Sequence, residues 1–393
     1  MSTLGIWFVG ARGSLATTAT LGLHALAAGL TEAIGCVTEH PELDRRGLAG
    51  YDEVLVGGHD VVDTPLVKRA EELVAGGVVP QHLLRLVGDR LAATEHRLRH
   101  GVENAGTSGR GQRAEVERLA RDIRAFGEEV DHVVVVDVSS TEQPYSPDDD
   151  TSSWSALRAA WEAGRAPLPA SSVYACAALL ADAAHAGFTP STGIDLPALR
   201  QLAHQRAIPF AGCDGKTGET LVKSALAPMF ATRALEVRSW TSVNLLGGGD
   251  GATLADPAAA SSKTRAKRSG LDSMLGRPVD GPMHIDYVAD LGDWKTAWDH
   301  VRFDGFLGTR MTMQFTWEGC DSTLAAPLVL DLARLLGRAR AAGVLGPVPE
   351  LGFFFKSPYD SDEHRLAQQW EALTRWSADC AARVERLTGE PDS

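Results

Sequence analysis

The chain has 393 residues and a formal net charge of −13 at pH 7. Its length fits two domains, or one large domain with an insertion. The excess of acidic residues is not offset by a stripe of basic residues. This argues against a surface that binds nucleic acid or an anionic membrane, so neither partner is expected. A phosphorylated small substrate is still compatible with this balance, because a few cations inside a cleft are enough to bind it.

Targeting segments and cysteine sites are also not predicted. No apolar run reaches the roughly eighteen residues of a membrane-spanning helix, and the N-terminus shows no secretory signal. We therefore expect a cytoplasmic protein. The five cysteines are scattered and form no C-x-x-C pair, so neither a disulfide framework nor a zinc site is predicted. No clear cluster of metal ligands is apparent, so no metal is predicted; the alternative is a divalent cation held by Asp250 and nearby acids.

The first third of the chain alternates short strands with helices. Residues 4–10 predict a buried strand, and residues 14–29 have helical apolar spacing. Two further short strands are predicted at 34–38 and 53–56. Residues 65–130 are rich in Arg, Glu, Leu and Ala and predict helices, interrupted by a Gly/Ser/Asn loop at 101–112.

The β-branched run at 132–138 is typical of a central parallel strand that is covered on both faces. Helices are predicted near 154–163 and 173–187. Strands that alternate with helices in this way indicate an α/β fold with a doubly wound parallel sheet.

The pattern changes after about residue 213. Residues 236–244, 283–288 and 310–317 alternate like half-exposed strands, which predicts a second, more antiparallel sheet inserted into the first domain. The segments 324–343 and 362–388 return to helical spacing.

A glycine-rich stretch, VGARGSLA, follows the first predicted strand and opens a helix. Gly10 and Gly13 there would let the backbone approach a diphosphate, and the helix N-terminus favours its charge. The second predicted strand ends at Glu39, 26 residues after Gly13, where an acidic residue can bind a ribose hydroxyl. The spacing departs from G-x-G-x-x-G, and the alternative is a tight turn; we favour a dinucleotide.

The chain holds only seven lysines among its 38 lysines and arginines, and six of the seven lie between 216 and 356. In an arginine-rich background, a lysine that persists is a candidate for chemistry, because its compact charge and movable pKa differ from those of arginine. For any single lysine the alternative is a solvated surface position. The lysines are Lys68, Lys216, Lys223, Lys263, Lys267, Lys295 and Lys356.

Two of the lysine motifs have a recognisable form. The stretch GCDGKTGET places Lys216 and Thr217 beside Asp214 and would line a polar pocket, or else form a surface turn. In SSKTRAK, Lys263 and Lys267 are four residues apart, so on a helix they share one face. Their mutual repulsion is relieved by a bound anion or a lowered pKa; the alternative is a solvated basic turn.

Lys295 and Lys356 complete the set, and Lys356 follows three phenylalanines at the end of an apolar stretch. Asp250 in GGGDG and Asp321 in EGCDST are carboxylates in small-residue settings. Each can orient a lysine or move a proton, although each alone is also typical of a turn or a helix cap.

Taken together, the motifs resemble those of the inositol-phosphate synthases of the archaeal and bacterial type. The stretches that carry the resemblance are GCDGKTGETLVK, SVNLLGGGDG, SSKTRAK, GDWKTAWD, CDSTLAAPLVLDL and FFFKSP, supported by VGARGSLATT, VGGHD, DVSSTE, SSVYACAALLA and FTPSTG. They occur in one order over nearly the whole chain.

The resemblance implies site residues. The catalytic set it implies is Lys263, Lys267, Lys295, Lys356, Asp214, Asp250 and Asp321. The implied NAD-binding set is Gly10, Ala11, Arg12, Gly13, Ser14, Leu15, Glu39, Gly58, Asp60, Ser139, Ser140, Thr141, Asp214 and Asp250. The implied substrate-binding set is Lys216, Thr217, Gly218, Asn244, Gly248, Gly249 and the four catalytic lysines.

The resemblance also implies a Rossmann-type NAD-binding domain at 1–213, an inserted α+β catalytic and tetramer-forming domain at 214–321, and a return to the first domain at 322–393. The implied activity closes D-glucose 6-phosphate into 1D-myo-inositol 3-phosphate. NAD would be reduced and re-oxidised in each turnover, so the enzyme would be an isomerase. The implied assembly is a homotetramer.

Three departures from the family pattern keep other substrates open. Val243 replaces a usual Tyr, Gly248 and Gly249 replace bulkier polar residues, and the segment near residue 105 differs. A reshaped pocket would favour another hexose phosphate, such as fructose 6-phosphate, closed to a five-membered cyclitol phosphate. A simple NAD-dependent sugar-phosphate dehydrogenase and a catalytically inactive NAD-binding protein are weaker alternatives, because the lysines and aspartates are all present.

Overall fold

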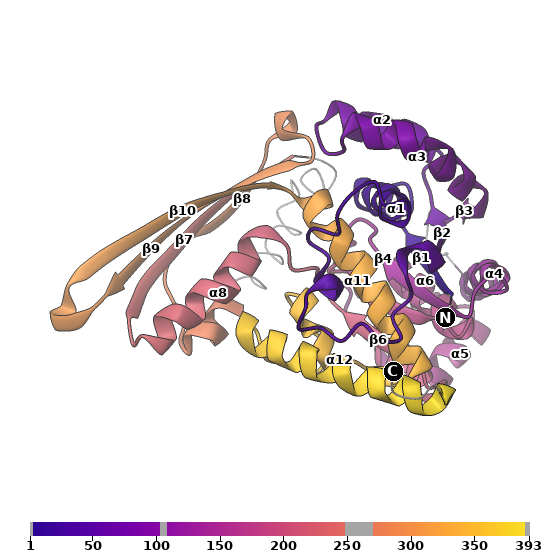
Figure 1. The fold of residues 1–393 in the computed structure, drawn as a ribbon. Helices are drawn as coiled ribbons and strands as arrows, with labels where there is room; N and C mark the ends of the chain where they lie inside the picture. Colours follow the sequence, from indigo (N-terminus) through magenta and orange to yellow (C-terminus); the bar gives the residue numbers. More distant parts are fainter. Residues whose placement is uncertain (1–2, 103–107, 248–269, 390–393) are drawn as a thin grey trace.

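The computed structural model describes residues 3–102, 108–247 and 270–389. It consists of a seven-stranded sheet flanked by helices and a separate four-stranded sheet (Figure 1). The four-stranded sheet and its covering helix extend away from the larger sheet (Figure 1).

The seven-stranded sheet has the order β11-β6-β5-β4-β1-β2-β3, and every neighbouring pair is parallel. Its strands are β1 (Leu4–Val9), β2 (Val54–Asp60), β3 (Leu98–His100), β4 (His132–Asp137), β5 (Ala184–Gly187), β6 (Pro209–Gly212) and β11 (Gly346–Pro347). The chain winds outward from β1 in both directions, so the strand order reverses between β1 and β4. Ligands of open α/β sheets bind outside the carboxyl ends of the strands at such a reversal.

Helices cover both faces of this sheet, which confirms the doubly wound prediction. One hydrophobic cluster includes side chains of α1 (Ser14–Ala27), α2 (Leu66–Ala75), α3 (Gln81–Thr94), α11 (Asp321–Ala341) and α12 (Leu366–Thr388). A second cluster includes side chains of α4 (Gly109–Gly127), α5 (Trp154–Glu162), α6 (Ala170–Leu180) and α7 (Pro197–Gln205).

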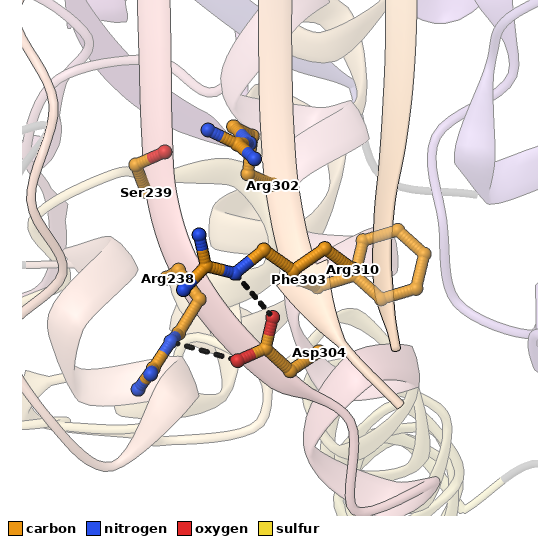
Figure 2. A pocket seen from close by; sticks show the side chains of 6 residues that line it. All are labelled: Arg238, Ser239, Arg302, Phe303, Asp304 and Arg310. Carbon is orange, nitrogen blue, oxygen red and sulfur yellow. Dashed lines mark ion pairs between the residues drawn. The ribbon is translucent and has the colours of Figure 1, made fainter. Parts of the chain in front are cut away.

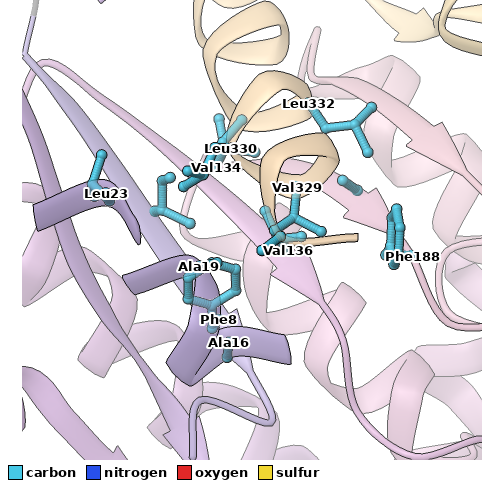
Figure 3. Packing of buried hydrophobic residues seen from close by; sticks show 14 of the residues in the cluster. Phe8, Ala16, Ala19, Leu23, Val134, Val136, Phe188, Val329, Leu330 and Leu332 are labelled. Carbon is cyan, nitrogen blue, oxygen red and sulfur yellow. The ribbon is translucent and has the colours of Figure 1, made fainter. Parts of the chain in front are cut away.

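The central strands contribute to both clusters because successive side chains point to opposite faces. On β1, Phe8 packs into the first cluster and Trp7 into the second. On β4, Val134 and Val136 face the first cluster and Val135 faces the second. Figure 3 shows Phe8 next to Ala16 and Ala19 of α1, and Val136 next to Val329 of α11. The continuous valine run therefore forms the buried central strand that its sequence predicts.

The second sheet has the order β10-β9-β7-β8. Its strands are β7 (Glu236–Leu246), β8 (Met283–Tyr287), β9 (Trp294–Asp304) and β10 (Arg310–Cys320). Strand β9 pairs antiparallel with β7 and β10, whereas β7 and β8 are parallel. Helix α8 (Gly218–Thr232) covers one face, where Phe230 packs in one cluster with Trp240 and Val301.

The chain leaves the large sheet after β6 and returns to it through α11, which runs against β4, β5 and β6. The mixed α/β class with an inserted second sheet is thus as expected. The exact division at 213 and 321 stays a prediction.

Two expected elements are wrong. Residues 34–38 form a turn that leads into a 3-10 helix at Val37–Glu39, because Asp331 of α11 accepts the Val37 and Thr38 N–H groups that a strand ladder would use. The expected helix at 173–187 ends at Leu180, and β5 occupies its last residues.

Candidate active site

The β1–α1 loop has the geometry of a diphosphate cradle. Gly10 has φ +83°, and a Cβ there would lie 3.0 Å from Ser139 Cα, so only glycine fits this position. Gly13 is the N-cap of α1 and leaves the first-turn N–H groups without a side-chain cap. Free N–H groups and the positive end of the helix dipole favour an anion at this point.

The end of β2 holds this loop in place. The backbone N–H groups of Gly10 and Ala11 donate to the His59 carbonyl at 2.9 and 3.1 Å. The Arg12 N–H donates to the Asp60 carboxylate at 2.6 Å. Asp60, expected to bind the cofactor, therefore fixes the backbone of the loop.

A cavity of about 360 Å³ opens between this loop, the end of β4 and one end of the second sheet, where β7 ends and β9 begins. Residues from widely separated parts of the chain meet there. The predicted site residues that line it are Gly13, Ser14, Leu15, Ser139, Ser140, Thr141, Asp214, Thr217, Lys295, Asp321 and Lys356.

Two lysine–aspartate pairs lie in this cleft. Lys356 Nζ donates to Asp214 Oδ1 at 2.8 Å, and Lys295 Nζ lies 3.3 Å from Asp321 Oδ2. Thr217 Oγ1 donates to the other oxygen of Asp321 at 3.1 Å. Burial acts to raise the pKa of Asp321, but the Lys295 and Lys356 ammonium groups outweigh it and lower that pKa. The two carboxylates thus keep two ammonium groups fixed in the cleft.

The backbone that carries Asp214 is held by the chain around Lys356. Asp214 has φ +60°, a left-handed conformation that aspartate tolerates better than most residues. The Lys356 N–H donates to the Asp214 carbonyl at 2.7 Å, and the Lys216 N–H donates to the Phe354 carbonyl at 2.8 Å. The lysine–aspartate pair therefore rests on a fixed backbone rather than on two free side chains.

A second helix N-terminus opens into the cleft. Thr217 is the N-cap of α8, makes no side-chain cap bond there, and lines the cavity together with Gly215 and Thr220. Its hydroxyl donates to Asp321 instead. This N-terminus of α8, which has no side-chain cap, forms a second place for an anionic group near the Lys295–Asp321 pair.

Asp137 is a site residue that the sequence reasoning missed. It ends β4 and is completely buried, and its Oδ1 accepts from the Ser139 N–H at 3.0 Å and the Ser139 hydroxyl at 2.6 Å. Burial raises the pKa of Asp137 to about 6, although the hydrogen bonds from Ser139 oppose this. Asp137 therefore shapes the Ser139 loop from beneath without reaching the cavity.

Arg69 was missed as well. It reaches from α2 into the cleft, where its Nη2 donates to Ser14 Oγ at 2.6 Å. No local motif marks this arginine, because its position depends on how α2 packs against α1. Other cavity-lining residues that were not predicted include Phe188, Thr189, Pro190, Thr220, Leu246, Asp293, Trp294 and Ser322.

Several predicted residues do not line the cleft. Lys216 points toward α12, where its Nζ donates to Gln369, and burial lowers its pKa to about 7. Gly218 packs under Trp317, and Asn244 is buried on β7. Gly58 packs against the Phe8 backbone beneath the β1–α1 loop.

The premise for a ribose contact by Glu39 is wrong. Glu39 does not end a strand; it belongs to the 3-10 helix and accepts from Arg334 at 2.9 Å and from Arg45 at 2.6 Å. These ion pairs hold the segment against α11. The acidic residue that ends the second strand is Asp60.

Five predicted residues lie outside the described residues: Asp250, Lys263, Lys267, Gly248 and Gly249. Within the described ranges, no group of three or more His, Cys, Asp or Glu side chains is arranged to hold a metal ion. No helix in those ranges is both long and apolar enough to cross a bilayer.

Comparison with known proteins gives a consistent family. The model of the myo-inositol-1-phosphate synthase family matches residues 4–377. The chain is 32% identical to inositol-3-phosphate synthase 1 of Bacteroides thetaiotaomicron, over 95% of this chain and 93% of that protein. A plant relative, a probable inositol 3-phosphate synthase isozyme of Arabidopsis thaliana, is 31% identical over 72% of this chain but only 59% of its own length.

Solved structures share the fold. The inositol-3-phosphate synthase of Caenorhabditis elegans superposes with a TM-score of 0.85 at 20% identity, covering 97% of this chain and 86% of that one. A myo-inositol-1-phosphate synthase-related protein of Thermotoga maritima gives 0.76 at 23% identity, covering 96% and 98%. The chain belongs to the myo-inositol-1-phosphate synthase family.

Proposed function

We propose that this protein converts D-glucose 6-phosphate to 1D-myo-inositol 3-phosphate with NAD as a catalytic cofactor. The observation that carries the proposal is the cleft in which the pairs Lys356–Asp214 and Lys295–Asp321 face the glycine-rich loop of a dinucleotide fold. Family membership supports the same reaction, since the match to the bacterial inositol-3-phosphate synthase covers 93% of that protein.

The β1–α1 loop fits the diphosphate of NAD. A Cβ at Gly10 would fill the space beside Ser139, and the N-terminus of α1 has no competing side-chain cap. We assign the diphosphate to Gly13 through Leu15 and the nicotinamide side to Ser139, Ser140 and Thr141, with Arg69 as a further diphosphate ligand. When bound, NAD supplies the hydride acceptor and donor for C5 of the sugar.

The substrate phosphate is assigned to the N-terminus of α8, beside Thr217 and Thr220. This end of the helix lines the cleft and faces Lys295 across Asp321. Binding of the phosphate at this end of the cleft would hold the sugar carbons in position for the reaction at the other end.

The two described lysines stabilise the negative charge that develops on substrate oxygens. A ketone at C5 makes the C6 proton acidic; a cleft lysine or the substrate phosphate takes this proton, and the enolate carbon then attacks the C1 aldehyde. Oxygen atoms carry negative charge in the enolate and in the aldol step. Fixed ammonium groups in the cleft stabilise such oxyanions. Asp214 and Asp321 orient Lys356 and Lys295 through these ion pairs, and we assign the same kind of role to Lys263, Lys267 and Asp250.

The fructose 6-phosphate alternative has less support. Val243, one of its three sequence signals, pairs with Trp298 on the face of the sheet opposite α8 and does not line the cleft. The other two signals, at Gly248–Gly249 and near residue 105, lie outside the described residues. A simple dehydrogenase would not need two fixed ammonium groups besides its base.

We further propose a homotetramer and a cytoplasmic location. The face of the four-stranded sheet that α8 leaves uncovered carries Trp298, which is 37% exposed. A second copy packing on this face would bury it. NAD and hexose phosphates are intracellular compounds, which supports the location. The division into domains at 1–213, 214–321 and 322–393 follows the same reasoning.

The test is to incubate the protein with NAD and either glucose 6-phosphate or fructose 6-phosphate, identify products by NMR and follow absorbance for NADH. We expect inositol phosphate from glucose 6-phosphate without net NADH. A five-membered cyclitol phosphate from fructose 6-phosphate would replace the substrate assignment. Stoichiometric NADH without a carbocycle would leave a dehydrogenase.

A further inference from the structure

Asp137 is a completely buried carboxylate directly beneath the wall of the cleft. It is the last residue of β4, at the edge where the strand order of the large sheet reverses. Its Oδ1 accepts from the N–H and the hydroxyl of Ser139, and Ser139 lines the cleft. Ser139 therefore separates this carboxylate from the part of the cleft to which the nicotinamide is assigned.

No positive side chain balances Asp137 within the described ranges. It forms no ion pair with a lysine or arginine there, and the charged side chain that acts on its pKa is Glu142, which raises it further. Its second oxygen, Oδ2, is buried and accepts no hydrogen bond from any described residue. Because an unbalanced charge is costly to bury, burial raises the pKa of Asp137 to about 6.

The elements packed around Asp137 add polar groups but no charge. Asp137 pairs with Gly187 of β5, and a Cβ at Gly187 would lie 3.8 Å from His185 Cε1. Burial lowers the pKa of His185 to about 4, so this ring is neutral near pH 7. Tyr174 of α6 and Tyr359 also lie close enough for the charge of Asp137 to act on them, and burial raises the pKa of both.

Other carboxylates of low exposure have cations beside them. Asp299 is also completely buried, but Lys223 Nζ lies 3.3 Å from its Oδ1. Asp304, at the far end of β9, lies between Arg238 Nε at 2.9 Å and Arg310 Nε at 3.7 Å, as Figure 2 shows. The carboxylate that ends β4 has no such partner in the part of the chain that the structure describes.

We propose that Asp137 is the charge partner of the nicotinamide ring, ionised when NAD⁺ is bound and protonated when NADH is bound. The oxidised ring carries one positive charge and the reduced ring carries none, so only the oxidised ring supplies the missing cation. Asp137 acts across Ser139 and is a positioning residue. The inference rests on the nicotinamide placement proposed above, and it does not depend on which sugar phosphate reacts.

The size and sign of the effect follow from proton linkage. A neighbouring positive charge lowers the pKa of a carboxyl group by about 1–3 units, and we expect about one unit because Ser139 lies between the two groups. Ionisation of Asp137 then favours NAD⁺ over NADH, so the ratio of their affinities rises with pH through the pKa of Asp137 and becomes constant above it. With a pKa of about 6 in the absence of NAD⁺, this ratio should rise about fivefold between about pH 5 and pH 8.

The test measures the dissociation constants of NAD⁺ and NADH across this pH range, by fluorescence of bound NADH and its displacement by NAD⁺. Wild type should show the fivefold rise. Asp137→Asn keeps an oxygen that accepts from Ser139 but has no proton to lose, so its affinity ratio should not change with pH. Glu142→Gln is the matched control, since it removes the other carboxylate of this loop and should keep the wild-type pH dependence.

A second measurement needs no variant. Calorimetric titration in two buffers of different ionisation enthalpy, at about pH 5.5, should show that NAD⁺ binding releases about half a proton per chain and that NADH binding releases none.

Equal proton release with both cofactors, or a wild-type affinity ratio that is constant with pH, would overturn the proposal. So would an Asp137→Asn variant with the wild-type pH dependence, or a Glu142→Gln variant that alone loses it. No sugar phosphate is present in these experiments, so failure to form inositol phosphate would refute the proposed function and leave this inference standing. Failure of the proton linkage would leave the cyclisation reaction untouched.

Discussion

Replacing Lys356 by methionine tests the role of the cleft lysines most sharply. Methionine keeps much of the side-chain length and removes the ammonium group that lies 2.8 Å from Asp214 Oδ1. Loss of one preorganised charge that stabilises a developing oxyanion costs about 3 kcal/mol, or about 10²–10³-fold in kcat. We therefore expect Lys356→Met to lower the rate of inositol phosphate formation by that factor.

The structure also sets the cost to stability. The Asp214 side chain is only 9% exposed, so leaving its carboxylate without the ammonium costs about 1–3 kcal/mol of unfolding free energy. The backbone bonds between the segments of Lys356 and Asp214 do not involve the replaced side chain. The variant should therefore fold, and the pKa of Asp321 should rise because one of the two lysines that lower it is lost.

The assay is the initial rate of product formation at saturating NAD, with urea unfolding run in parallel. Lys68→Met, which removes an exposed lysine on α2, is the control and should match wild type in both. A Lys356→Met enzyme with kcat within threefold of wild type, together with the expected loss of stability, would show that Lys356 has only a structural role and would refute the oxyanion argument.

Three further substitutions test charged residues that are buried or line the cleft. Burial raises the pKa of Asp137 to about 6, so the ionisation of this group lowers the unfolding free energy as pH rises from about 4 to 6. Asp137→Asn should therefore raise the unfolding free energy at pH 7.5 by up to about 3 kcal/mol and leave it unchanged at pH 4. Lys223 forms buried ion pairs with Glu219 and Asp299, so Lys223→Met should cost about 3–5 kcal/mol in urea unfolding. Arg69→Ala should weaken NAD binding about tenfold in equilibrium dialysis.

Each of these has a matched control on the surface. Asp379→Asn should leave the pH profile of stability as it is, Lys68→Met should leave urea unfolding unchanged, and Arg85→Ala should leave NAD affinity unchanged. An Asp137→Asn variant equally stable at both pH values, a Lys223→Met loss below about 1 kcal/mol, or an unaltered NAD affinity in Arg69→Ala would each contradict the corresponding argument.

The fold was predictable because its main signals are local. The valine run of β4 and the half-exposed alternation of β7 and β10 need no distant contacts to be read from the sequence. The prediction for segment 34–38 failed for the opposite reason. Its short run of apolar and β-branched residues around Gly35 is ambiguous alone. Asp331, nearly 300 residues later, decides how the N–H groups of Val37 and Thr38 bond.

The site was predictable in part. Scarcity of lysine pointed to Lys295 and Lys356, which do meet in the cleft. The same scarcity also pointed to Lys216 and Lys223, whose ammonium groups are buried against Gln369 and against Glu219. A lysine kept for a buried ion pair and one kept for chemistry look alike in sequence, because only the partner, supplied by another segment, separates them.

The most direct test of the proposed function uses D-glucose 6-phosphate deuterated at C5. If C5 is oxidised and then reduced again on the same bound NAD, the inositol phosphate product should retain the deuterium, as read by mass spectrometry, with no deuterated NADH in solution. Deuterium that leaves the sugar and accumulates in free NADH, without a carbocyclic product, would contradict the account and identify a dehydrogenase.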